Sequence, residues 1–516
     1  MGQPLIVADP NALTSWNSDW KGLRVAVLGL GVTGFSAADT LIELGAEVLV
    51  LASKADPERS DLLGVIGAGW YEGSLDEPPQ QLIDFAPHLV VVSPGFRPDH
   101  PVLAWAEGVG MPIWGDIELA WRVRDKTNAA EWICVTGTNG KTTTVQLTTH
   151  LLAAAGARVA AVGNIGIPVL DAVRDPTGFD VLVVELSSFQ LHWINRNAGG
   201  ELAPLASVCL NLAEDHYDWH GSADAYRAAK AKVYDNTRVA AVYNKADAAT
   251  MRMVEEADVV EGCRAIGFDL GTPGPSDLGL VGDLVVDRAF HDARHSSALE
   301  LTTHGELAAV GLAAPHSVAN VLAAVALARA YGIEPGVVRE AIATFRVDHH
   351  RTELVAVADD VTWVNDSKAT NPHAANASLA AFGSVVWIVG GLLKGVDVND
   401  VVKAHAPRLR AAILIGIDRE PLRAAFERHA PALPLFEVDA AETNEVMRDA
   451  VRLSAAVAQP GDVVLLAPAA ASMDQFNDYA DRGRRFTAAV LEHTGGGEDD
   501  EPGRIAPRPD ETPDAS

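Results

Sequence analysis

Residues 132–143 read WICVTGTNGKTT, and this stretch decides the fold of the middle of the chain. It begins as an apolar, strand-like run, turns through two glycines and continues as a predicted helix over residues 142–155. A strand, a glycine turn and a helix N-terminus form a cradle for phosphate, because free backbone N–H groups and the helix dipole attract an anion. Lys141 adds a positive charge, and Thr142 stands where a hydroxyl ligates the Mg²⁺ of a bound nucleotide.

The loop is shorter than the general P-loop, because Val135 stands at the position of the first glycine. A glycine turn with a solvated lysine is the alternative interpretation of a bare GK[ST] sequence. The apolar strand before the turn and the helix after it favour a nucleotide site.

The chain has 516 residues, which is too long for one hydrophobic core and predicts about three domains. Its formal net charge of −29 disfavours nonspecific binding to nucleic acids or to anionic membranes. A site for nucleotide phosphates must therefore be a local positive island, which the loop around Lys141 supplies.

The chain contains three cysteines, Cys134, Cys209 and Cys263. Two lie in apolar strand-like runs and none pairs at a metal-binding spacing, which predicts buried, reduced thiols in a cytoplasmic protein. Residues 1–20 lack the charged and apolar regions of a secretory signal. No uncharged apolar stretch is long enough to span a bilayer, so integral membrane association is not expected.

Strand-like runs alternate with helical patterns, which predicts βαβ units, parallel sheets and an α/β fold. We expect a Rossmann-like domain over 1–127, a central P-loop-type ATPase domain over 128–346 and a second Rossmann-like domain over 347–494. Within the central domain, 267–282 is rich in Gly, Pro, Asp and Leu and is expected to be a surface loop. The acidic end, 495–516, has almost no apolar residues and is predicted to be disordered.

The first domain begins with a strand over 23–28, a GLGVTG turn at 29–34 and a helix over 35–44. This order matches the G-x-G-x-x-G turn of dinucleotide-binding domains, and it also fits a plain tight βα turn. A dinucleotide site requires an acid at the end of the second strand to hold the ribose hydroxyls. That strand, 47–51, is followed by Ala52 and Ser53, so NAD binding is disfavoured.

Glu185 and His216 follow apolar runs in the central domain, and we expect both at the ends of strands. Ligands gather at the carboxyl edge of a parallel sheet, and a hard cation such as Mg²⁺ prefers carboxylate oxygens, so Glu185 suits it. His216 suits it less well, because a lone histidine is more often structural. Lys230 lies in a helical pattern and, taken by itself, is expected to be a solvated surface lysine.

Several further strings accompany the phosphate loop. They are GNIG at 163–166, VLVVELSSFQL at 181–191, NLAEDH at 211–216, NDSKATNP at 365–372, GG at 390–391 with Lys394, and ASMDQF at 471–476. Together with TGTNGKT they resemble the Mur ligase and folylpolyglutamate synthetase superfamily, from about residue 23 to about residue 485. The SSFQL and NDSKATN strings are similar to those of the D-glutamate-adding members of the Mur ligase family.

The resemblance implies an ATP-dependent ligase that forms an amide bond in peptidoglycan precursor synthesis. ATP would phosphorylate the terminal carboxylate of UDP-N-acetylmuramoyl-L-alanine, and the amine of D-glutamate would displace phosphate from the acyl phosphate. The resemblance implies two Mg²⁺ sites, one at Thr142 beside ATP and one at Glu185 and His216. It also implies a carbamylated Lys230, because a lysine with a lowered pKa can react with CO₂ and become an anion. We expect a monomer.

The same resemblance assigns the site residues. Those that act in the reaction are Lys141, Glu185, His216 and Lys230. Those that bind ATP are Gly137, Thr138, Asn139, Gly140, Lys141, Thr142, Thr143, Asn320, Arg351 and Asp366. Those that bind the UDP substrate are Gly31, Val32, Thr33, Gly34, Ser93, Pro94, Gly95 and Asn164. The two carboxylates of D-glutamate would be held by Thr370, Lys394 and Ser472, with Tyr479 where the family often has phenylalanine.

Alternatives stay open at this point. Another ligase of the superfamily, such as a folylpolyglutamate synthetase, would add a different amino acid. An NAD-dependent oxidoreductase is disfavoured by Ala52, and a noncatalytic nucleotide-binding module would not need Glu185, His216, Thr370 and Lys394 together. Asn320 could equally lie on the solvated face of a helix over 317–331, and Arg351 could form a surface ion pair.

Overall fold

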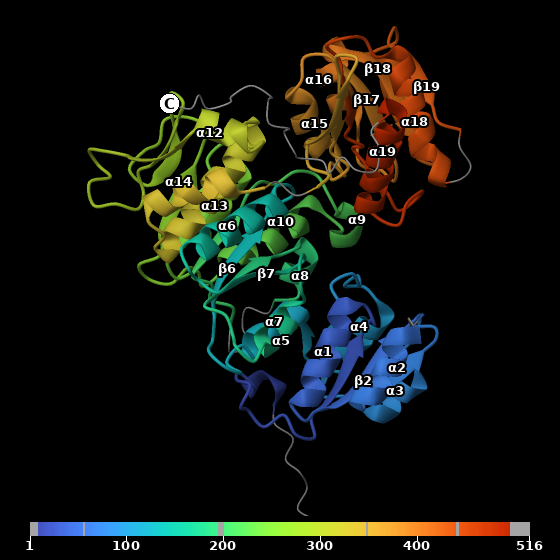
Figure 1. Ribbon diagram of the computed structural model, residues 1–516. Helices are drawn as coiled ribbons and strands as arrows, with labels where there is room; N and C mark the ends of the chain where they lie inside the picture. The colour runs from blue at the N-terminus through green and yellow to red at the C-terminus, as the bar shows by residue number, and fades with distance from the viewer. Residues whose placement is uncertain (1–8, 55–56, 195–200, 347–348, 440–442, 496–516) are drawn as a thin grey trace, which may run out of the picture. The chain divides into compact units, whose positions relative to one another are not determined.

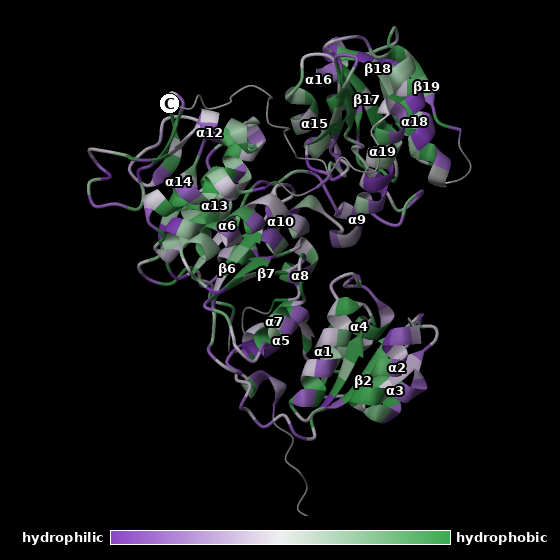
Figure 2. Cartoon of the chain, in the orientation of Figure 1, coloured by the Kyte–Doolittle hydropathy of each residue, from purple (hydrophilic) through white to green (hydrophobic). Residues whose placement is uncertain are grey.

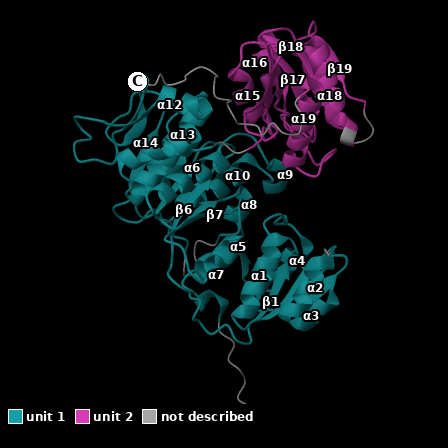
Figure 3. Ribbon diagram, in the orientation of Figure 1, with its two compact units in different colours: residues 1–346 teal, residues 347–516 magenta. Residues whose placement is uncertain are grey.

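The computed structural model describes residues 9–54, 57–194, 201–346, 349–439 and 443–495. The chain divides into two compact units, Met1–Arg346 and Val347–Ser516, drawn in teal and magenta in Figure 3. Two sheets lie in unit 1 and a third lies in unit 2. The predicted disordered tail lies outside the described residues from position 496 onward.

The first sheet of unit 1 is parallel, with its strands in the order β3-β2-β1-β4-β5. Alternate residues of its middle strand enter two different apolar clusters, Val25 and Val27 in one and Ala26 and Leu28 in the other. Both faces of the sheet are therefore covered, which explains why its strands read as continuous apolar runs. The strands are β1 Arg24–Leu28, β2 Glu47–Ala52, β3 Gly69–Glu72, β4 Leu89–Val92 and β5 Ile113–Gly115; the helices are α1 Val32–Glu43, α2 Pro57–Ile66, α3 Gln80–Phe85, α4 Pro101–Gly108 and α5 Asp116–Arg122.

The second sheet of unit 1 has the order β14-β13-β12-β11-β10-β9-β6-β8-β7. It is parallel from β7 to β12 and ends in two antiparallel pairings, β12 with β13 and β13 with β14. The strands are β6 Glu131–Thr136, β7 Val159–Gly163, β8 Val181–Glu185, β9 Ala206–Cys209, β10 Ala240–Asn244, β11 Arg264–Phe268, β12 Asp277–Val281, β13 Leu284–Asp287 and β14 Leu299–Thr303.

Helices α6 and α13 pack against each other beside this sheet (Figure 1). Residues 321–329 of α13 are all buried, as the run of Ala, Val and Leu requires. The helices of this part are α6 Lys141–Ala154, α7 Val169–Arg174, α8 Ser188–His192, α9 Tyr217–His220, α10 Ala223–Ala231, α11 Ala248–Glu255, α12 His304–Ala309, α13 Pro315–Tyr331 and α14 Pro335–Thr344.

Unit 2 has one mixed sheet in the order β15-β16-β20-β17-β18-β19, in which only the edge strand β15 is antiparallel to its neighbour among the described residues. Figure 2 shows its strands in the colour of hydrophobic residues. The colour of hydrophilic residues gathers on the helices and loops around them. The strands are β15 Glu353–Ala358, β16 Val361–Asn365, β17 Val385–Gly390, β18 Leu409–Ile415, β19 Leu435–Glu437 and β20 Val463–Leu466; the helices are α15 Pro372–Ala380, α16 Asn399–His405, α17 Glu420–His429, α18 Thr443–Val457 and α19 Tyr479–Thr494.

The structure corrects the prediction of a surface loop over 267–282, because residues 277–281 form strand β12 of the large sheet. Its glycines permit close approach of the backbone: a Cβ on Gly279 would lie 2.3 Å from the carbonyl oxygen of Gly271. The Asp277 carboxylate also accepts hydrogen bonds from Lys245 Nζ at 2.6 Å and from the Gly274 backbone at 3.0 Å. Glycine and aspartate have a low propensity for strands, so tertiary contacts rather than propensity determine the strand here.

Two further predictions were wrong in detail. Helix α1 begins at Val32 rather than at residue 35, so the last residues of the GLGVTG turn form its first turn. Strand β9 ends at Cys209, so His216 does not lie at a strand end but at the N-cap of α9.

Cys134 and Cys209 are buried and Cys263 is half-buried, and all three are free thiols. Burial raises the pKa of Cys209 to about 11, which keeps this thiol protonated. None of the described helices is both long and apolar enough to cross a membrane.

A close backbone approach in unit 2 yields a stability prediction. Gly390 has φ +130°, and a Cβ there would lie 2.0 Å from the carbonyl oxygen of Ile415 on the adjacent strand. Gly390→Ala should therefore destabilise the chain by about 2–4 kcal/mol, combining a collision with backbone strain. Gly461→Ala is the control, because Gly461 has φ +88° and open space around it, so strain alone should cost about 1 kcal/mol. Equal losses in calorimetric melting would contradict the steric explanation.

Candidate active site

The phosphate loop joins the end of β6 to the first residue of α6 at the carboxyl edge of the large sheet. Gly137 and Gly140 have φ +152° and +84°, so the turn uses conformations that glycine adopts without strain. Asn211, two residues after the end of the neighbouring strand β9, holds the loop. Its carbonyl and side-chain oxygens accept from the N–H groups of Thr138 at 3.0 Å and Asn139 at 2.9 Å, and its Nδ2 donates to the Asn139 carbonyl at 3.0 Å.

Lys141 lies over its own loop, with Nζ donating to the carbonyl oxygens of Gly137 at 2.9 Å and Thr138 at 3.0 Å. The ammonium is therefore held at the mouth of the glycine turn. Thr142 and Thr143, on the first turn of α6, are each 7% exposed. The strand, glycine turn and helix N-terminus are thus formed by the residues that the sequence indicated.

Asn320 is buried at 8% exposure on α13, so its interpretation as a solvated residue was wrong. Its amide lies directly against the phosphate loop, since a Cβ on Gly140 would be 2.3 Å from Asn320 Oδ1. The side chain of Asn320 therefore borders the nucleotide loop.

Lys230 is also buried, at 2% exposure, and its interpretation as a surface lysine was wrong. Its Nζ donates to the Gly137 carbonyl at 3.0 Å and to Thr136 Oγ1 at 3.4 Å. Burial, reinforced by the charge of Lys141, lowers the pKa of Lys230 to about 7. This amine is therefore substantially neutral near neutral pH, and it points at the phosphate loop.

Glu185 ends β8, next to the phosphate-loop strand, and is 1% exposed. Its Oε1 accepts from Asn164 Nδ2 at 2.8 Å, whereas its buried Oε2 has no hydrogen-bond partner among the described residues. A buried carboxylate oxygen without a partner is costly, and a cation would satisfy it. Asn164, assigned to the UDP substrate, is thereby placed beside this carboxylate.

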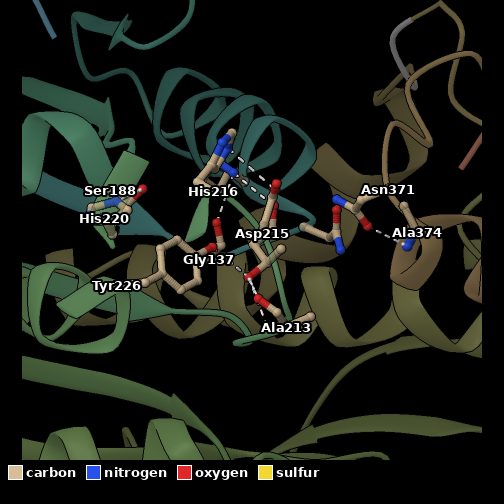
Figure 4. A network of polar contacts seen from close by, with 12 residues as sticks. Gly137, Ser188, Ala213, Asp215, His216, His220, Tyr226, Asn371 and Ala374 are labelled. Carbon is tan, nitrogen blue, oxygen red and sulfur yellow. Dashed lines mark hydrogen bonds and ion pairs between the residues drawn. The ribbon is translucent and has the colours of Figure 1, made fainter. Parts of the chain in front are cut away.

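His216 adopts a left-handed conformation, φ +54°, as the N-cap of α9. Its Nε2 lies 3.4 Å from Asp215 Oδ2, and Figure 4 shows the imidazole beside that carboxylate. Asp215, which had no predicted role, thus pairs with the histidine. The ring of Phe189, from the SSFQL string, packs edge-on against His216 with centroids 4.7 Å apart.

Sequence reasoning missed two residues that organise this site. Asn211 clamps the loop, and Tyr226 Oη lies 3.0 Å from Thr138 Oγ1. Tyr226 precedes Lys230 by one helical turn on α10, and the Lys230 ammonium lies 4.9 Å from its ring centroid. The i, i+4 spacing was a usable signal, but only burial shows that both side chains face the loop.

The two loops assigned to the UDP substrate lie together at the carboxyl edge of the first sheet. A Cβ on Gly29 would be 2.7 Å from Ser93 Oγ, and one on Gly34 would be 2.0 Å from the Gly29 carbonyl. The N-cap of α1 is Gly31, which has no side chain to cap the helix. Gly31 and Val32 are both exposed. Ser93 Oγ is buried without a partner in the described structure. A helix N-terminus with a hydroxyl beside it suits an anion.

In unit 2, Asp366 is a buried acid whose ionised form the charge of Arg351 favours. Burial nevertheless raises the pKa of Asp366. The Asp366 carboxylate accepts from the backbone N–H of Thr352 at 3.3 Å and from the Ser378 hydroxyl.

The residues assigned to D-glutamate lie on loops that follow adjacent strands of unit 2. Leu392 and Ala471 exchange backbone hydrogen bonds of 2.9 and 3.1 Å, which brings the loop of Lys394 alongside that of Ser472. The Ala469 N–H donates to the Ala369 carbonyl at 2.9 Å, which adds the loop of Thr370. Lys394 is exposed and Ser472 is buried. Tyr479 begins α19, and the Lys368 ammonium lies 3.7 Å from its ring centroid.

The protein side chains do not by themselves form a closed metal cage, because no group of three or more His, Cys, Asp or Glu converges within the described ranges. Mg²⁺ tolerates this, since it binds through one or two carboxylates and completes its shell with water and phosphate oxygens. The donors near the loop, a carboxylate and a threonine hydroxyl, are of the hard oxygen type that Mg²⁺ prefers.

Comparison with known proteins now places the chain in a family. Residues 23–115 match the Mur ligase MurD-like N-terminal domain, residues 135–328 the Mur ligase middle domain, and residues 350–470 the glutamate ligase domain of Mur ligases. The chain belongs to the Mur ligase family, a family of ATP-dependent ligases. This membership decides against the oxidoreductase and against a noncatalytic binding module.

Relatives agree with this assignment over nearly the whole chain. The UDP-N-acetylmuramoylalanine–D-glutamate ligase of Leifsonia xyli is 66% identical over 506 residues, covering 96% of this chain and 98% of that protein. The protein of the same name from Streptomyces avermitilis is 50% identical, covering 92% and 99%. The solved structure of UDP-N-acetylmuramate-alanine ligase from Thermotoga maritima matches the fold with a TM-score of 0.53 at 19% identity, covering 91% of this chain and 100% of that one.

Proposed function

We propose that the chain joins D-glutamate to UDP-N-acetylmuramoyl-L-alanine with ATP, forming ADP and phosphate in peptidoglycan precursor synthesis. One observation carries the proposal: the buried amine of Lys230 donates to Gly137 of the phosphate loop, and the buried carboxylate of Glu185 ends the strand beside β6, in a chain whose full-length relatives bear this activity in their names. A ligase that makes an acyl phosphate needs such groups to stabilise the negative charge of the phosphate, and it needs no side-chain nucleophile.

In the proposed reaction, the terminal carboxylate of the UDP substrate attacks the γ-phosphorus of ATP, and ADP leaves. The amine of D-glutamate then attacks the acyl carbon, a proton is lost from nitrogen, and inorganic phosphate leaves. Residues 137–143 bind the ATP phosphates, with the backbone N–H groups at the start of α6 as donors, since those of Thr138 and Asn139 donate to Asn211. Lys141 stabilises the charge of the transferring phosphoryl group. Asn320 contacts the adenine side of ATP. We further propose that Arg351 and Asp366 bind ATP.

The donor set described above fits Mg²⁺. Thr142 would hold one ion, and Glu185 and His216 would hold a second. Bound Mg²⁺ would neutralise negative charge on the phosphate oxygens. The orphaned Oε2 of Glu185 supports the second position, and the Asp215 carboxylate orients His216 for it.

Lys230 is proposed to be carbamylated: its neutral amine attacks CO₂, a proton leaves, and an anionic carbamate forms. Burial beside Gly137 supports this, because the pKa of about 7 makes the amine available as a nucleophile. The carbamate would place a carboxylate-like group beside the metal donors, where the chain otherwise offers few oxygens.

The roles of the domains follow from these sites. We propose that residues 1–127 bind the UDP part through Gly31, Val32, Thr33, Gly34, Ser93, Pro94 and Gly95, that 128–346 bind ATP, and that 347–494 bind D-glutamate. Asn164 would bind the UDP substrate and also donate its hydrogen bond to the Glu185 carboxylate. We propose that the protein acts as a monomer. Its nucleotide substrates support a cytoplasmic location.

Phosphate release with UDP-N-acetylmuramoyl-L-alanine and ATP tests the function. D-Glutamate should stimulate release, whereas L-glutamate, L-lysine and diaminopimelate should not. Lys141→Ala should nearly abolish release while calorimetric binding of the UDP substrate is kept, since Lys141 acts on ATP. Equal stimulation by another acceptor would point to a different ligase of the superfamily.

The carbamate yields a pH prediction. Carbamylation requires the neutral amine, whose fraction falls as pH drops through about 7, so occupancy and activity should fall together below that pH. With ¹³C-labelled bicarbonate, a carbamate signal should appear in the NMR spectrum of the wild type and of Lys403→Ala, an exposed control on α16, and vanish in Lys230→Ala. An unchanged spectrum in Lys230→Ala would refute the modification at this residue.

Lys394 is proposed to pair with a carboxylate of D-glutamate. Because a small dianion needs a cation, Lys394→Ala should raise the KM for D-glutamate by roughly thirty-fold to several-hundred-fold and leave the KM for ATP nearly unchanged. Lys403→Ala should change neither constant. An unaltered KM for D-glutamate with intact kcat would remove Lys394 from the amino-acid site.

A further inference from the structure

Helix α9 is a single short turn whose ends are both fixed. His216 precedes it with φ +54° and Gly221 follows it with φ +78°, so the chain enters and leaves through left-handed residues. Trp219 is its buried residue, at 8% exposure. The indole thus extends from the same turn that presents His216.

The indole and His216 pack on one common ring. Phe189 of α8 lies 4.6 Å from Trp219 and 4.7 Å from His216, measured between ring centroids. The Trp219 ring also lies 4.5 Å from that of its neighbour His220. The Nε2 of His220 is 3.0 Å from Ser188 Oγ, as Figure 4 shows. Aromatic packing of this kind fixes the orientation of each ring relative to the others. A shift of the Trp219 ring would therefore change the orientation of the His216 ring.

The other edge of the same indole reaches the first sheet's loops. Trp219 Nε1 donates to the carbonyl oxygen of Gly95 at 3.3 Å. Gly95 directly follows Ser93 and Pro94 in the loop after β4, whose Ser93 hydroxyl lies against Gly29 of the β1–α1 turn. One side chain therefore touches both the loop proposed to bind the UDP substrate and the ring that supports the histidine proposed to bind metal.

We infer that Trp219 is a positioning residue that ties the Ser93–Gly95 loop to the helix presenting His216, so that the UDP substrate is held in register with the phosphate loop. The inference rests on the proposed function. The nucleotide loop has its own hydrogen bonds, with Asn211 and with the hydroxyl of Tyr226, and neither bond includes the indole N–H of Trp219. Among the described residues, the Tyr226 ring meets Trp219 only through the ring of His220, which the loss of an N–H leaves in place. Loss of the indole N–H should thus weaken binding of the UDP substrate and leave that of ATP unchanged.

Trp219→Phe tests this, because it keeps a ring against Phe189 and removes the N–H donor. Losing one neutral hydrogen bond should raise both the KM and the calorimetric Kd for UDP-N-acetylmuramoyl-L-alanine by about three- to ten-fold, with the KM for ATP within about two-fold of wild type. Trp193→Phe is the matched control: Trp193 is buried at 6% exposure in the neighbouring segment, and its Nε1 has no hydrogen-bond partner in the described structure. This control variant should leave the KM values for the UDP substrate and for ATP unchanged.

Replacing Trp219 with its sulfur isostere, 3-benzothienyl-L-alanine, removes the N–H while keeping the shape, so it should reproduce the effect of Trp219→Phe even if the phenylalanine variant folds poorly. The inference is overturned if the isostere binds the UDP substrate as the wild type does, or if ATP and the UDP substrate are weakened equally. Failure of the wild type to bind the UDP substrate in the same calorimetry would instead refute the proposed function.

Discussion

The sharp turn between β6 and α6 is the constraint on which the rest of the central site depends. It brings a backbone with two positive-φ glycines under the side chains of Asn211 and Asn320, and any Cβ at Gly140 would collide with Asn320. The same turn directs the Gly137 carbonyl toward two lysines, Lys141 and Lys230. Because the turn lies at the carboxyl edge of a parallel sheet, the ends of the neighbouring strands deliver Glu185 and Asn211 beside it.

Burial of charged groups around this turn gives the site its chemistry. Lys230 and Glu185 are almost completely removed from solvent, and each loses hydration that a ligand could replace. The lysine responds by a lowered pKa, which makes its amine reactive, and the carboxylate keeps one oxygen without a partner. Interactions with phosphate and metal are strong in such surroundings, because little water competes for them. A chain with a net charge of −29 can bind nucleotide phosphates only through such a local arrangement.

Much of the fold was predictable because parallel strands buried on both faces read as apolar runs. The strands around Val25, Val135, Val183 and Val386 were all expected, as were the long helices after the glycine turns. The strand over 277–281 was not predicted, because its glycine and aspartate have a low strand propensity and the strand depends on tertiary contacts. His216 was misplaced because the apolar run ends several residues before it and a short helix intervenes. Local propensity contains no information about either outcome.

The sequence by itself determined the α/β class, the strand–turn–helix around Lys141 and the resemblance to Mur ligases, since these depend on short-range order: a strand, a glycine turn, a lysine and a helix. Only the tertiary structure decided which polar residues are removed from water. Lys230 and Asn320 look like solvated helix residues in the sequence, and they are buried because α10 and α13 turn those positions toward the loop. The same holds for Trp219 and Gly95, which are 124 residues apart in the chain and become partners only when helix α9 meets the loop after β4 within unit 1. Burial and long-range contact depend on the whole fold, which no local pattern of residues encodes.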